Sequence, residues 1–409
     1  MKRPIAISLS PNAQGKDVWL SFKKIFFPWN YFRGNNVKLL EQWFRQYFNA
    51  SFAVSFASGR GAFLAILKAL DIKEGDEVVI QSFTCVAVPN MIIGIGAKPV
   101  YVDIDSSLTM DTLDLERKIT NKTKAIVVQH TFGISSNMEA ISKIAKKYKI
   151  PLIEDCAHTI GATYKGKKLG SLGTASFFSF GRDKAFSSVF GGVALTNEEL
   201  LGKKIRVFQK KQRNPSFFWV MQQLFHPIAF YFILPVYNFF YLGKVILVLF
   251  QRLHLLSFPV DSKEKQGKIS PDSIKKLPNV LTCLALFQLK RLNEFNKKRE
   301  EISKIYIKEI TNKNIDFPSK NNIPFLRFPV LINNRDEIFD KFKKKGIYLG
   351  QWYSNIIDPK GSDLRKINYQ RGSCPNAEFI AKRIINLPTY INLKDKDIKK
   401  IVKLLNNYA

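Results

Sequence analysis

Cysteine is scarce in this chain, which has only four among its 409 residues. Cys85, Cys156, Cys283 and Cys374 lie far apart, and no two of them form a Cys-x-x-Cys pair. This spacing excludes the disulfide framework of small secreted proteins and a zinc site built on paired cysteines. Free thiols are typical of a reducing compartment, so we expect a cytoplasmic protein without a bound metal.

Acidic residues are also few, with 33 Asp and Glu against 64 Lys and Arg and a formal net charge of +31. Such an excess favours anionic partners, which include nucleic acid, acidic lipid headgroups and phosphorylated substrates. A codon bias towards Lys, Ile, Asn and Phe would produce the same excess without a function. The sequence lacks zinc-finger spacing, a basic region followed by heptads and an aromatic RNA-binding signature, so we expect no nucleic acid partner.

Repeats and low-complexity tracts are absent, and 46% of the residues are hydrophobic, which indicates a globular protein with one large and one smaller domain. From residue 52 to residue 196, short apolar strands alternate with segments of helical periodicity. The expected strands lie at 52–56, 78–80, 100–102, 125–128, 152–153, 175–180 and 193–196. This alternation predicts an α/β fold, with a mostly parallel sheet and helices on both faces. Ligands of such sheets bind beyond the carboxyl ends of the strands.

The alternation stops at residues 205–272, which we predict to form an apolar, aromatic-rich insertion. Residues 214–243 carry no formal charge, and basic residues flank them on both sides. A membrane span needs about 20 apolar residues, but Pro227 and Pro235 interrupt this segment. Because positive charge marks the cytoplasmic side of a membrane and both flanks are basic, we predict a kinked helical hairpin that contacts the membrane from that side. A buried core insertion or an oligomer contact is the alternative.

The insertion divides the chain into two predicted domains. We expect residues 1–204 and 273–300 to form a large α/β domain, and residues 301–409 to form a smaller C-terminal α/β domain. The periodicity predicts a long helix over 278–307 and a strand over 325–332. Further helices are expected over 335–345, 374–385 and 396–408.

Two apolar strands lead into residues that suit a pyridoxal phosphate (PLP) site. The strand at 152–153 leads into Asp155, and the strand at 175–180 is followed by Lys184. A lysine amine can bind the cofactor's aldehyde covalently, and a carboxylate can keep the pyridine nitrogen protonated so that the ring accepts electrons. Either residue alone is common at a strand end, as a solvated lysine or a helix cap. Their joint order predicts a PLP enzyme.

Further motifs surround these two residues. They are Ala57–Ala62, Gly75–Thr84, Gly96–Asp105, His130–Gly133, Ile153–His158, Ser179–Lys184, Gln288–Leu292 and Leu387–Pro388. In order, spacing and residue type, they resemble the DegT–StrS family of sugar aminotransferases over roughly residues 35–200 and 276–409. The resemblance implies the fold-type I architecture of PLP enzymes and a homodimer. It also implies transfer of an amino group from glutamate to a keto-sugar.

The resemblance gives catalytic roles to three residues. Lys184 would bind PLP and carry the proton during the transfer, and Asp155 would pair with the pyridine nitrogen. His158 would lie near the cofactor's phenolic oxygen, where the family has Gln or His. The expected partners are a sugar substrate on a nucleotide or lipid carrier and an amino-acid donor. The expected product is an amino sugar for a cell-surface polysaccharide.

The phosphate of PLP would be bound by Ser179 and by the backbone amides of Gly59 and Arg60 at a helix N-terminus. Arg60 replaces a small hydroxyl residue of the family, and its guanidinium can add a bidentate contact to the phosphate. Lys276 aligns with a family position that reaches the phosphate in the partner subunit, although a surface lysine is the simpler explanation.

Two positions depart from the family pattern. Cys85 stands where an aromatic ring usually stacks on the cofactor, and Phe190 stands where an acidic residue often precedes two glycines. A thiol cannot stack, so His130, Phe83 or the partner chain would have to cover the ring, and we include Cys85 and His130 among the residues expected at the cofactor.

The departures leave two alternatives open, which are a deoxysugar dehydratase on the same fold and a non-catalytic, membrane-associated regulator. Dehydratases of the family replace the cofactor-binding lysine by histidine, so Lys184 favours an aminotransferase. The regulator would have no need for Lys184, Asp155 and Ser179 together.

Overall fold

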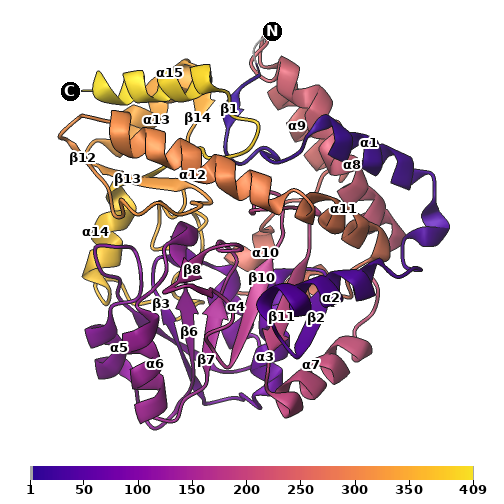
Figure 1. The fold of residues 1–409 in the computed structure, drawn as a ribbon, viewed down its shortest axis with the longest axis vertical. Helices are drawn as coiled ribbons and strands as arrows, with labels where there is room; N and C mark the ends of the chain where they lie inside the picture. The colour runs from indigo at the N-terminus through magenta and orange to yellow at the C-terminus, as the bar shows by residue number, and fades with distance from the viewer. Residues whose placement is uncertain (1–2, 409) are drawn as a thin grey trace.

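The computed structural model describes residues 3–408, and at its centre is a sheet of seven strands in the order β2–β11–β10–β7–β6–β3–β5 (Figure 1). The strands are β2 (Phe52–Phe56), β3 (Glu77–Gln81), β5 (Lys98–Val102), β6 (Thr123–Gln129), β7 (Leu152–Asp155), β10 (Ala175–Ser179) and β11 (Gly192–Thr196). In this sheet, all of whose residues are described, β11 alone runs antiparallel to its neighbours. The expected α/β fold with a mostly parallel sheet is therefore confirmed.

Helices cover both faces of the sheet, because neighbouring residues of each strand point to opposite sides. In β10, Phe177 stacks on Phe63 of α3 with 4.8 Å between ring centres, whereas Phe178 contacts Phe48 of α2 at 4.7 Å. One face is covered by α3 (Gly59–Ala69), α4 (Ala87–Ile93) and α7 (Glu199–Lys211). The other is covered by α2 (Asn36–Phe48), α5 (Thr112–Lys118) and α6 (Met138–Lys147).

The C-terminal part forms a smaller α/β unit around the antiparallel sheet β12–β13–β16. Its elements are β12 (Ile315–Asp316), β13 (Phe328–Ile332), α13 (Arg335–Lys344), β14 (Ile347–Tyr348), β15 (Ile357–Asp358), α14 (Pro375–Arg383), β16 (Ile384–Leu387) and α15 (Asp395–Asn406). One strand of this unit, β15, pairs in parallel with β4 (Thr84–Cys85) of the large domain. The small linking elements of the large domain are η2 (Thr131–Gly133) and the hairpin of β8 (Thr163–Tyr164) and β9 (Lys167–Lys168).

The N-terminal segment contacts the C-terminal unit and the insertion as well as the large domain, in which the sequence places residues 1–204. β1 (Ile5–Ala6) pairs in parallel with β14. The hydroxyl of Ser10 bonds to Nε2 of His226 at 2.8 Å, and the side-chain amide of Asn12 donates to the carbonyl of Lys184 at 2.5 Å. Pairing between strands so distant in the chain leaves no local pattern, which is why periodicity does not reveal it.

The helix expected over 278–307 is divided into α11 (Asn279–Leu289) and α12 (Leu292–Glu309). The bend coincides with a change of environment, because α11 is buried on most sides while α12 has one buried stripe. At the bend, the guanidinium of Arg291 donates to the side chains of Gln14, the N-cap of the first helix, and Asp17 in the first turn of that helix.

The insertion contains the expected pair of helices. Its elements are α8 (Phe217–Ile233), η3 (Leu234–Val236), α9 (Leu242–Arg252), α10 (Ser262–Lys265) and η4 (Pro271–Ile274), and α8 packs against α1 (Gly15–Ile25), which is followed by η1 (Pro28–Asn30). Residues Phe217–Val236 form one continuous helical stretch that is long and apolar enough to cross a membrane, but 56% of its most apolar window is buried inside the protein. A core helix passes the same test, so composition alone does not identify a span here.

Candidate active site

A cavity of about 150 Å³ lies at the carboxyl ends of the parallel strands, where the sequence predicts the site. Strands β2, β6, β7 and β10 end there, and the loop around Trp352 of the C-terminal unit lies over it. Seven of the eight residues predicted from the sequence line this cavity: Gly59, Arg60, Cys85, Asp155, His158, Ser179 and Lys184. The eighth, His130, does not line it.

Lys184 follows β10 by five residues, and its side chain enters the cavity. The amine lies 4.5 Å from the centre of the Trp352 ring, so it faces an aromatic surface instead of water. Burial lowers the pKa of this amine below its ordinary value, while the neighbouring Asp183 carboxylate acts in the opposite direction. A lysine of lowered pKa is deprotonated more readily, which is what a nucleophile requires.

Asp155 ends β7 and is only 5% exposed. Its Oδ1 accepts a hydrogen bond from the amide of Ala157 at 3.0 Å, and Oδ2 has no protein donor within residues 3–408. Burial raises the pKa of this carboxyl to about 6, against the opposing effects of the Ala157 amide and Lys184. A buried carboxylate with a free oxygen fits a cationic N–H group such as a protonated pyridine nitrogen.

His158 is held as a neutral ring. Burial lowers its pKa well below the ordinary value, and the positive charges of Lys184 and Arg327 act in the same direction. Its Nδ1 accepts a hydrogen bond from the amide of Phe132 at 3.3 Å, so Nε2 carries the proton and remains available as a donor. The ring is nearly parallel to that of Trp352, with 5.2 Å between the centres and 15° between the planes.

The start of α3 forms a cradle for an anion beside Ser179. Ser58 caps the helix by accepting from the amide of Gly61 at 3.2 Å, and the preceding amides of Gly59 and Arg60 have no intrahelical acceptor. A Cβ atom on Gly59 would lie 2.9 Å from Cβ of Ser179, so only glycine allows this close approach. Helix N-termini of this kind bind phosphate groups.

The side chain of Arg60 points away from this cradle. Its guanidinium is paired with Glu264 of α10, a carboxylate that is 2% exposed, and it also donates to the carbonyl of Pro259 at 3.2 Å. The guanidinium is thus engaged within the protein, and the bidentate phosphate contact predicted for it stays a prediction. Arg60 contributes through its backbone amide and connects the cavity to the insertion.

Arg182 is a cavity residue that the sequence does not single out. Its guanidinium lies 5.3 Å from the ring centre of Phe190 and donates to the carbonyl of Ser257 at 2.5 Å. Burial lowers its pKa to about 9, against the opposing effect of Asp183. An arginine between a glycine and an aspartate carries no helical or strand pattern, so nothing in the local sequence indicates this role.

Trp352 brings the C-terminal unit to the cavity, and Arg327 lies behind the lining in contact with Trp352 and Asp183; neither is predicted from the sequence. The guanidinium carbon of Arg327 lies 3.3 Å from the ring centre of Trp352, and Nη2 donates to Asp183 at 2.6 Å. Arg327 is 1% exposed, yet its Nε and Nη1 have no acceptor within the described residues. The side-chain nitrogen of Asn386 is also buried without a partner. Unpartnered buried donors of this kind suit an anionic ligand.

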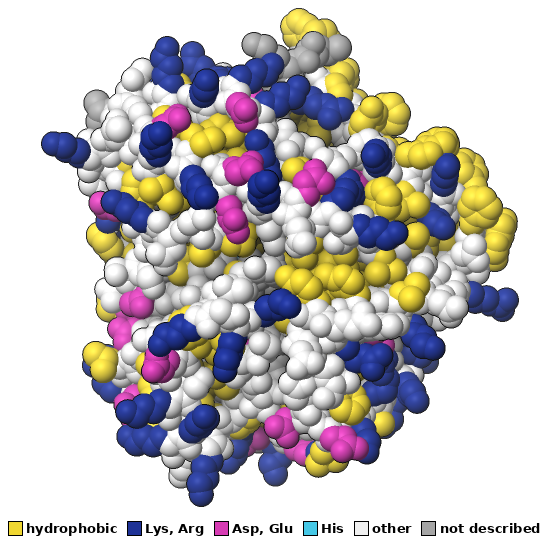
Figure 2. All heavy atoms as spheres, in the orientation of Figure 1, with side chains coloured by type: hydrophobic (Ala, Val, Ile, Leu, Met, Phe, Trp, Pro, Cys, Tyr) yellow, Lys and Arg dark blue, Asp and Glu magenta, His cyan; other side chains and the backbone are white. Residues whose placement is uncertain are grey.

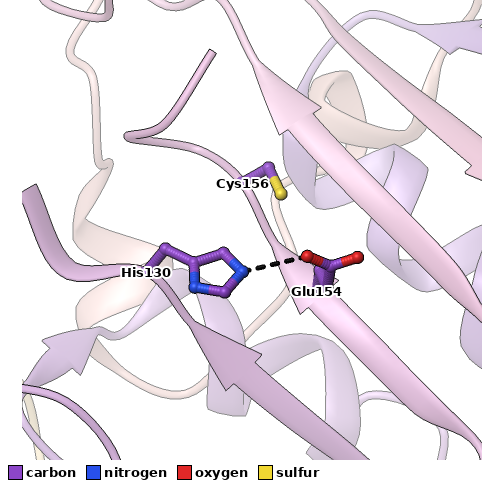
Figure 3. A group of neighbouring side chains, drawn as sticks. All are labelled: His130, Glu154 and Cys156. Carbon is purple, nitrogen blue, oxygen red and sulfur yellow. Dashed lines mark hydrogen bonds and ion pairs between the residues drawn. The ribbon is translucent and has the colours of Figure 1, made fainter. Parts of the chain in front are cut away.

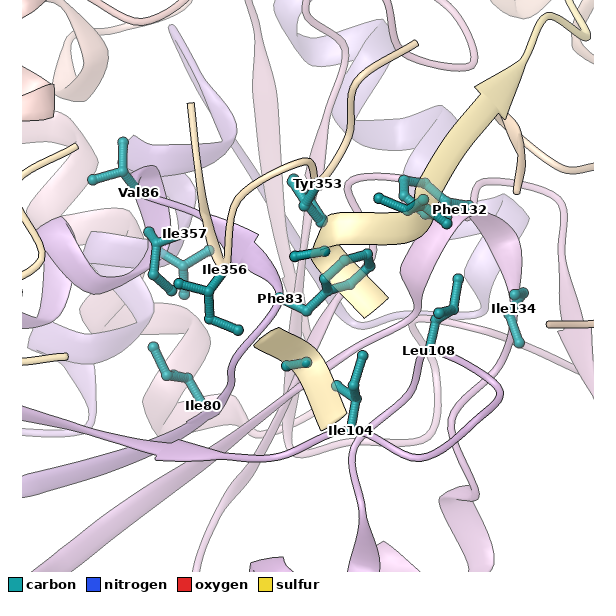
Figure 4. Close-up of a cluster of buried hydrophobic side chains, with 14 of the residues drawn as sticks. Ile80, Phe83, Val86, Ile104, Leu108, Phe132, Ile134, Tyr353, Ile356 and Ile357 are labelled. Carbon is teal, nitrogen blue, oxygen red and sulfur yellow. The ribbon is translucent and has the colours of Figure 1, made fainter. Parts of the chain in front are cut away.

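Cys85 lines the cavity as a neutral thiol, because burial raises its pKa to about 11. Neither Phe83 nor His130, which were expected to cover a cofactor ring in place of an aromatic at this position, lines the cavity. Phe83 contacts Tyr353 edge to face in the hydrophobic core beside it, with 5.3 Å between ring centres (Figure 4). Trp352 and His158 line the space as a nearly parallel pair of rings, and Phe63, Phe177, Phe190 and Tyr353 line it as well.

His130 belongs to a separate buried group with Glu154 and Cys156 (Figure 3). Its Nε2 donates to Glu154 at 3.0 Å, and its Nδ1 accepts from the amide of Ser136 at 3.2 Å. Three further amides donate to the Glu154 carboxylate at 2.6–2.8 Å: Gly170, Leu172 and Gly173. Residue types that could ligate a metal are thus engaged in hydrogen bonds that join β6, β7 and the loop before β10.

Lys276 lies after η4, where its amide donates to the carbonyl of Arg213 at 3.1 Å. It does not line the cavity of its own chain. Its contact with a phosphate in a partner subunit stays a prediction.

Together these groups fit PLP. The free oxygen of Asp155 and the open amides of α3 beside Ser179 can hold the ring nitrogen and the phosphate, and Lys184 can reach the aldehyde. The strongest indication of a phosphate site is at Gly59, where any side chain would block the close approach of α3 to Ser179.

Comparisons with known proteins agree with this geometry. A profile of the DegT/DnrJ/EryC1/StrS aminotransferase family matches residues 25–222 and 250–406. An uncharacterized protein from Methanocaldococcus jannaschii is 30% identical over 88% of this chain and 87% of its own length. The dTDP-3-amino-3,6-dideoxy-alpha-D-galactopyranose transaminase from Aneurinibacillus thermoaerophilus is 27% identical over 96% of each chain. The structure of a Helicobacter pylori aminotransferase involved in pseudoaminic acid biosynthesis has a TM-score of 0.76, with 22% identity and 98% of each chain covered.

Proposed function

Because the chain belongs to the DegT/DnrJ/EryC1/StrS aminotransferase family, we propose that it transfers an amino group from glutamate to a keto-sugar carried by a nucleotide. It is a PLP-dependent sugar aminotransferase of the fold-type I architecture, and solved structures of similar fold hold PLP or its amine form. The observation that carries the proposal is the convergence of Lys184, Asp155 and the α3 cradle on one cavity.

When bound, PLP supplies an electron sink for the carbon that loses its proton. Lys184 then acts as the general base and acid, because its amine, once displaced by the substrate amine, can take a proton from one carbon and return it to another. Asp155 keeps a proton on the ring nitrogen through its free oxygen. The Nε2–H of neutral His158 can donate a hydrogen bond to an oxygen in the cavity. Trp352 excludes water from the space above the amine.

A carboxylate-bearing donor is supported by Arg327. Nε and Nη1 of its buried guanidinium and the side-chain nitrogen of Asn386 have no acceptor among residues 3–408, so they can donate hydrogen bonds to a ligand. Glutamate, with two carboxylates, is the donor that we propose on this ground. A nucleotide carrier is supported by the dTDP-sugar named for the Aneurinibacillus relative.

A deoxysugar dehydratase and a non-catalytic regulator are less well supported. A dehydratase of this fold has histidine at the position of Lys184, and a regulator does not need a lysine amine inside a buried cavity. We further propose that the enzyme is a homodimer, that it works at the cytoplasmic face of the membrane, and that its amino sugar enters a cell-surface polysaccharide. The basic, aromatic insertion supports the membrane location.

The test is to incubate the PLP-loaded protein with glutamate and a panel of nucleotide-linked keto-sugars while measuring 2-oxoglutarate and the sugar product. We expect stoichiometric 2-oxoglutarate and amino sugar. Borohydride reduction followed by peptide mass spectrometry should place the covalent PLP adduct on Lys184. Lys184→Ala should retain PLP without turnover, because the proton carrier is gone. Lys143→Ala on α6 is the control and should behave as wild type. A fully active Lys184→Ala protein would disprove the proposal.

A further inference from the structure

The helices on one edge of the molecule expose large apolar side chains, and we call this surface the aromatic face. It is formed by α1, η1, α8, the loop after η3 and α9, and Figure 2 shows its hydrophobic side chains along the upper right edge. Its most exposed members, each between 56% and 86% exposed, are Trp19, Phe26, Trp29, Phe232, Phe240, Tyr241, Val245 and Leu253. Single exposed apolar residues are normal, but a contiguous patch marks an interaction site.

The α9 helix has apolar side chains on two sides, and one of these sides is exposed. Ile246, Leu247 and Phe250 contact the core between α9 and α8. Leu242, Val245 and Leu249 recur at helical spacing on another side, and each is at least 45% exposed. A helix that is apolar on two sides needs two apolar surroundings, and the described residues provide only one of them.

The exposed charges of the aromatic face are basic. Residues 212–260 of the insertion contain no Asp or Glu and carry Arg213, Lys244 and Arg252. The one acidic residue of α1, Asp17, is buried and paired with Arg291. Several aromatic rings carry a cation directly. Lys23 lies 4.8 Å from the ring centre of Trp19, Arg3 lies 5.2 Å from that of Tyr231, and Lys244 lies 4.6 Å from that of Tyr241. Aromatic rings beside basic groups are typical of the interface between a bilayer and water.

A groove of about 990 Å³ adjoins the aromatic face, and we call it the basic groove. It lies between the N-terminal segment, η3 and α15, and Phe239 belongs both to its wall and to the aromatic face. Its basic side chains are Arg3, Lys345, Lys394, Lys396 and Lys400, and Asp397 is the one acidic side chain among its lining residues. A groove with this charge, open next to an apolar surface, matches the phosphate layer above acyl chains.

We propose that the aromatic face is immersed in one leaflet of an anionic phospholipid bilayer and that the basic groove binds the lipid phosphates. This inference rests on the membrane location proposed above and names the lipid class and the contact site. At this surface a second copy of the chain is a poorer partner, because it carries the same excess of basic groups and complements the basic groove less well than lipid phosphates do. The α8 helix contributes one exposed side and does not cross the bilayer, since 56% of its most apolar window is buried.

The first experiment tests the aromatic face. The full-length, PLP-loaded protein is floated with vesicles of phosphatidylcholine and with vesicles of phosphatidylcholine mixed with phosphatidylglycerol. We expect binding to both and stronger binding to the mixed vesicles. The triple variant Trp29→Ser, Phe232→Ser, Phe240→Ser should lose both. The control is Leu113→Ser with Phe379→Ser, which removes exposed apolar side chains elsewhere and should bind as wild type. Absence of wild-type protein from both vesicle fractions would overturn the inference.

The second experiment tests the basic groove with Lys394→Glu and Lys396→Glu, two exposed positions at the N-cap and in the first turn of α15, where acidic residues suit a helix. Binding to the mixed vesicles should weaken at least about tenfold, because each basic group near an anionic surface is worth roughly fivefold. Binding to phosphatidylcholine should not change. The control reverses Lys143 and Lys146 on α6 in the same way. An equal loss of vesicle binding in the control would show that only the net charge matters, and it would overturn the proposed role of the basic groove.

Two further measurements distinguish lipid binding from the proposed aminotransferase reaction and from a contact between two copies of the chain. Aminotransferase turnover with a soluble sugar substrate should be unchanged in all variants, so a failure of lipid binding is distinct from a failure of the proposed reaction. Sedimentation velocity without lipid should give the same particle mass for wild type and for the aromatic-face variant. A smaller particle for the variant, with no vesicle binding by wild type, would show that the face joins two copies and would overturn the lipid contact.

Discussion

The Asp155 carboxyl stands in surroundings that favour its neutral form. Burial raises its folded-state pKa to about 6, from an ordinary value of 3.8. Because the folded protein without cofactor holds this proton more tightly than the unfolded chain, the stabilising contribution is present below about pH 4 and is lost as the pH rises through about 6. The loss is about 3 kcal/mol. PLP with a protonated ring nitrogen would supply the missing partner for the charged form.

Asp155→Asn should therefore separate stability from catalysis. The cofactor-free variant should lack the loss of about 3 kcal/mol between pH 4 and pH 7, because an amide does not ionise. It should also be nearly inactive, because an amide cannot keep the ring nitrogen protonated. Urea unfolding of both cofactor-free proteins at several pH values measures the first effect. Identical pH dependence in the two proteins would contradict the environment described for Asp155.

Arg327→Met should weaken the use of glutamate. Removing a charged donor pair costs about 2 kcal/mol, or roughly thirtyfold in KM for glutamate. The half-reaction between the amine form of the enzyme and the keto-sugar should change much less, since the sugar does not depend on a carboxylate contact. Stopped-flow measurement of each half-reaction gives the two effects separately. Arg117→Met, on an exposed side of α5, is the control, and an unchanged KM in the Arg327 variant would refute the role.

Among single residues, the local sequence predicts the cavity residues that lie near strand ends. It does not predict those that distant parts of the chain contribute. Lys184 and Asp155 follow strands directly, so their meeting could be predicted. Trp352 and Arg327 come from the C-terminal unit, and no local pattern ties them to the cavity. The prediction that places His130 at the cavity is wrong for a different reason. Side chains alternate along a strand, so Gln129 at the end of β6 lines the cavity while the next residue, His130, points to the opposite side and bonds to Glu154.

The α3 helix contributes its N-terminus, and Gly59 determines how closely it approaches β10. In Gly59→Ala the new methyl would lie 2.9 Å from Cβ of Ser179 and 3.2 Å from the carbonyl oxygen of Phe178, so the helix must move away. We expect PLP affinity to fall about tenfold or more, as the amides leave the phosphate. Gly15→Ala in α1 is the matched control, because its methyl would meet nothing within 4 Å. Absorbance titration with PLP measures the difference, and equal affinities would argue against the cradle.

Elements with strong local periodicity follow the sequence closely in both domains, and the strand and helices expected at 325–332, 335–345, 374–385 and 396–408 all lie within about three residues of their observed bounds. Departures occur where contacts between distant segments decide. The expected helix over 278–307 bends at Arg291, which reaches α1, and β1 joins β14 instead of the large domain. The exposed aromatic rings of α1 and η1 could not be assigned to this surface from the sequence of the insertion, because only the fold packs α1 against α8.

The whole molecule carries a net charge of +31, and this bears on the proposed homodimer. Two such chains repel each other, so apolar and hydrogen-bonded contacts must outweigh the repulsion. We expect sedimentation to show a particle of twice 46.9 kDa, with an association that tightens as salt is added and the repulsion is screened. A monomer at every salt concentration, in active protein, would contradict the dimer. Mixed dimers of two inactive variants that regain activity would support a site shared between subunits.

The pairing of β1 with β14 has a consequence for biosynthesis. Ribosomes add about 5–20 residues per second, so the first strand is made roughly tens of seconds before the strand that receives it. Until then the segment through Asn12, which holds the carbonyl of Lys184, lacks its anchor. The nascent large domain can form its sheet, but the loop of the reactive lysine is completed only after β14 has left the ribosome. PLP should therefore be acquired after β14 emerges, not while the large domain alone has been made.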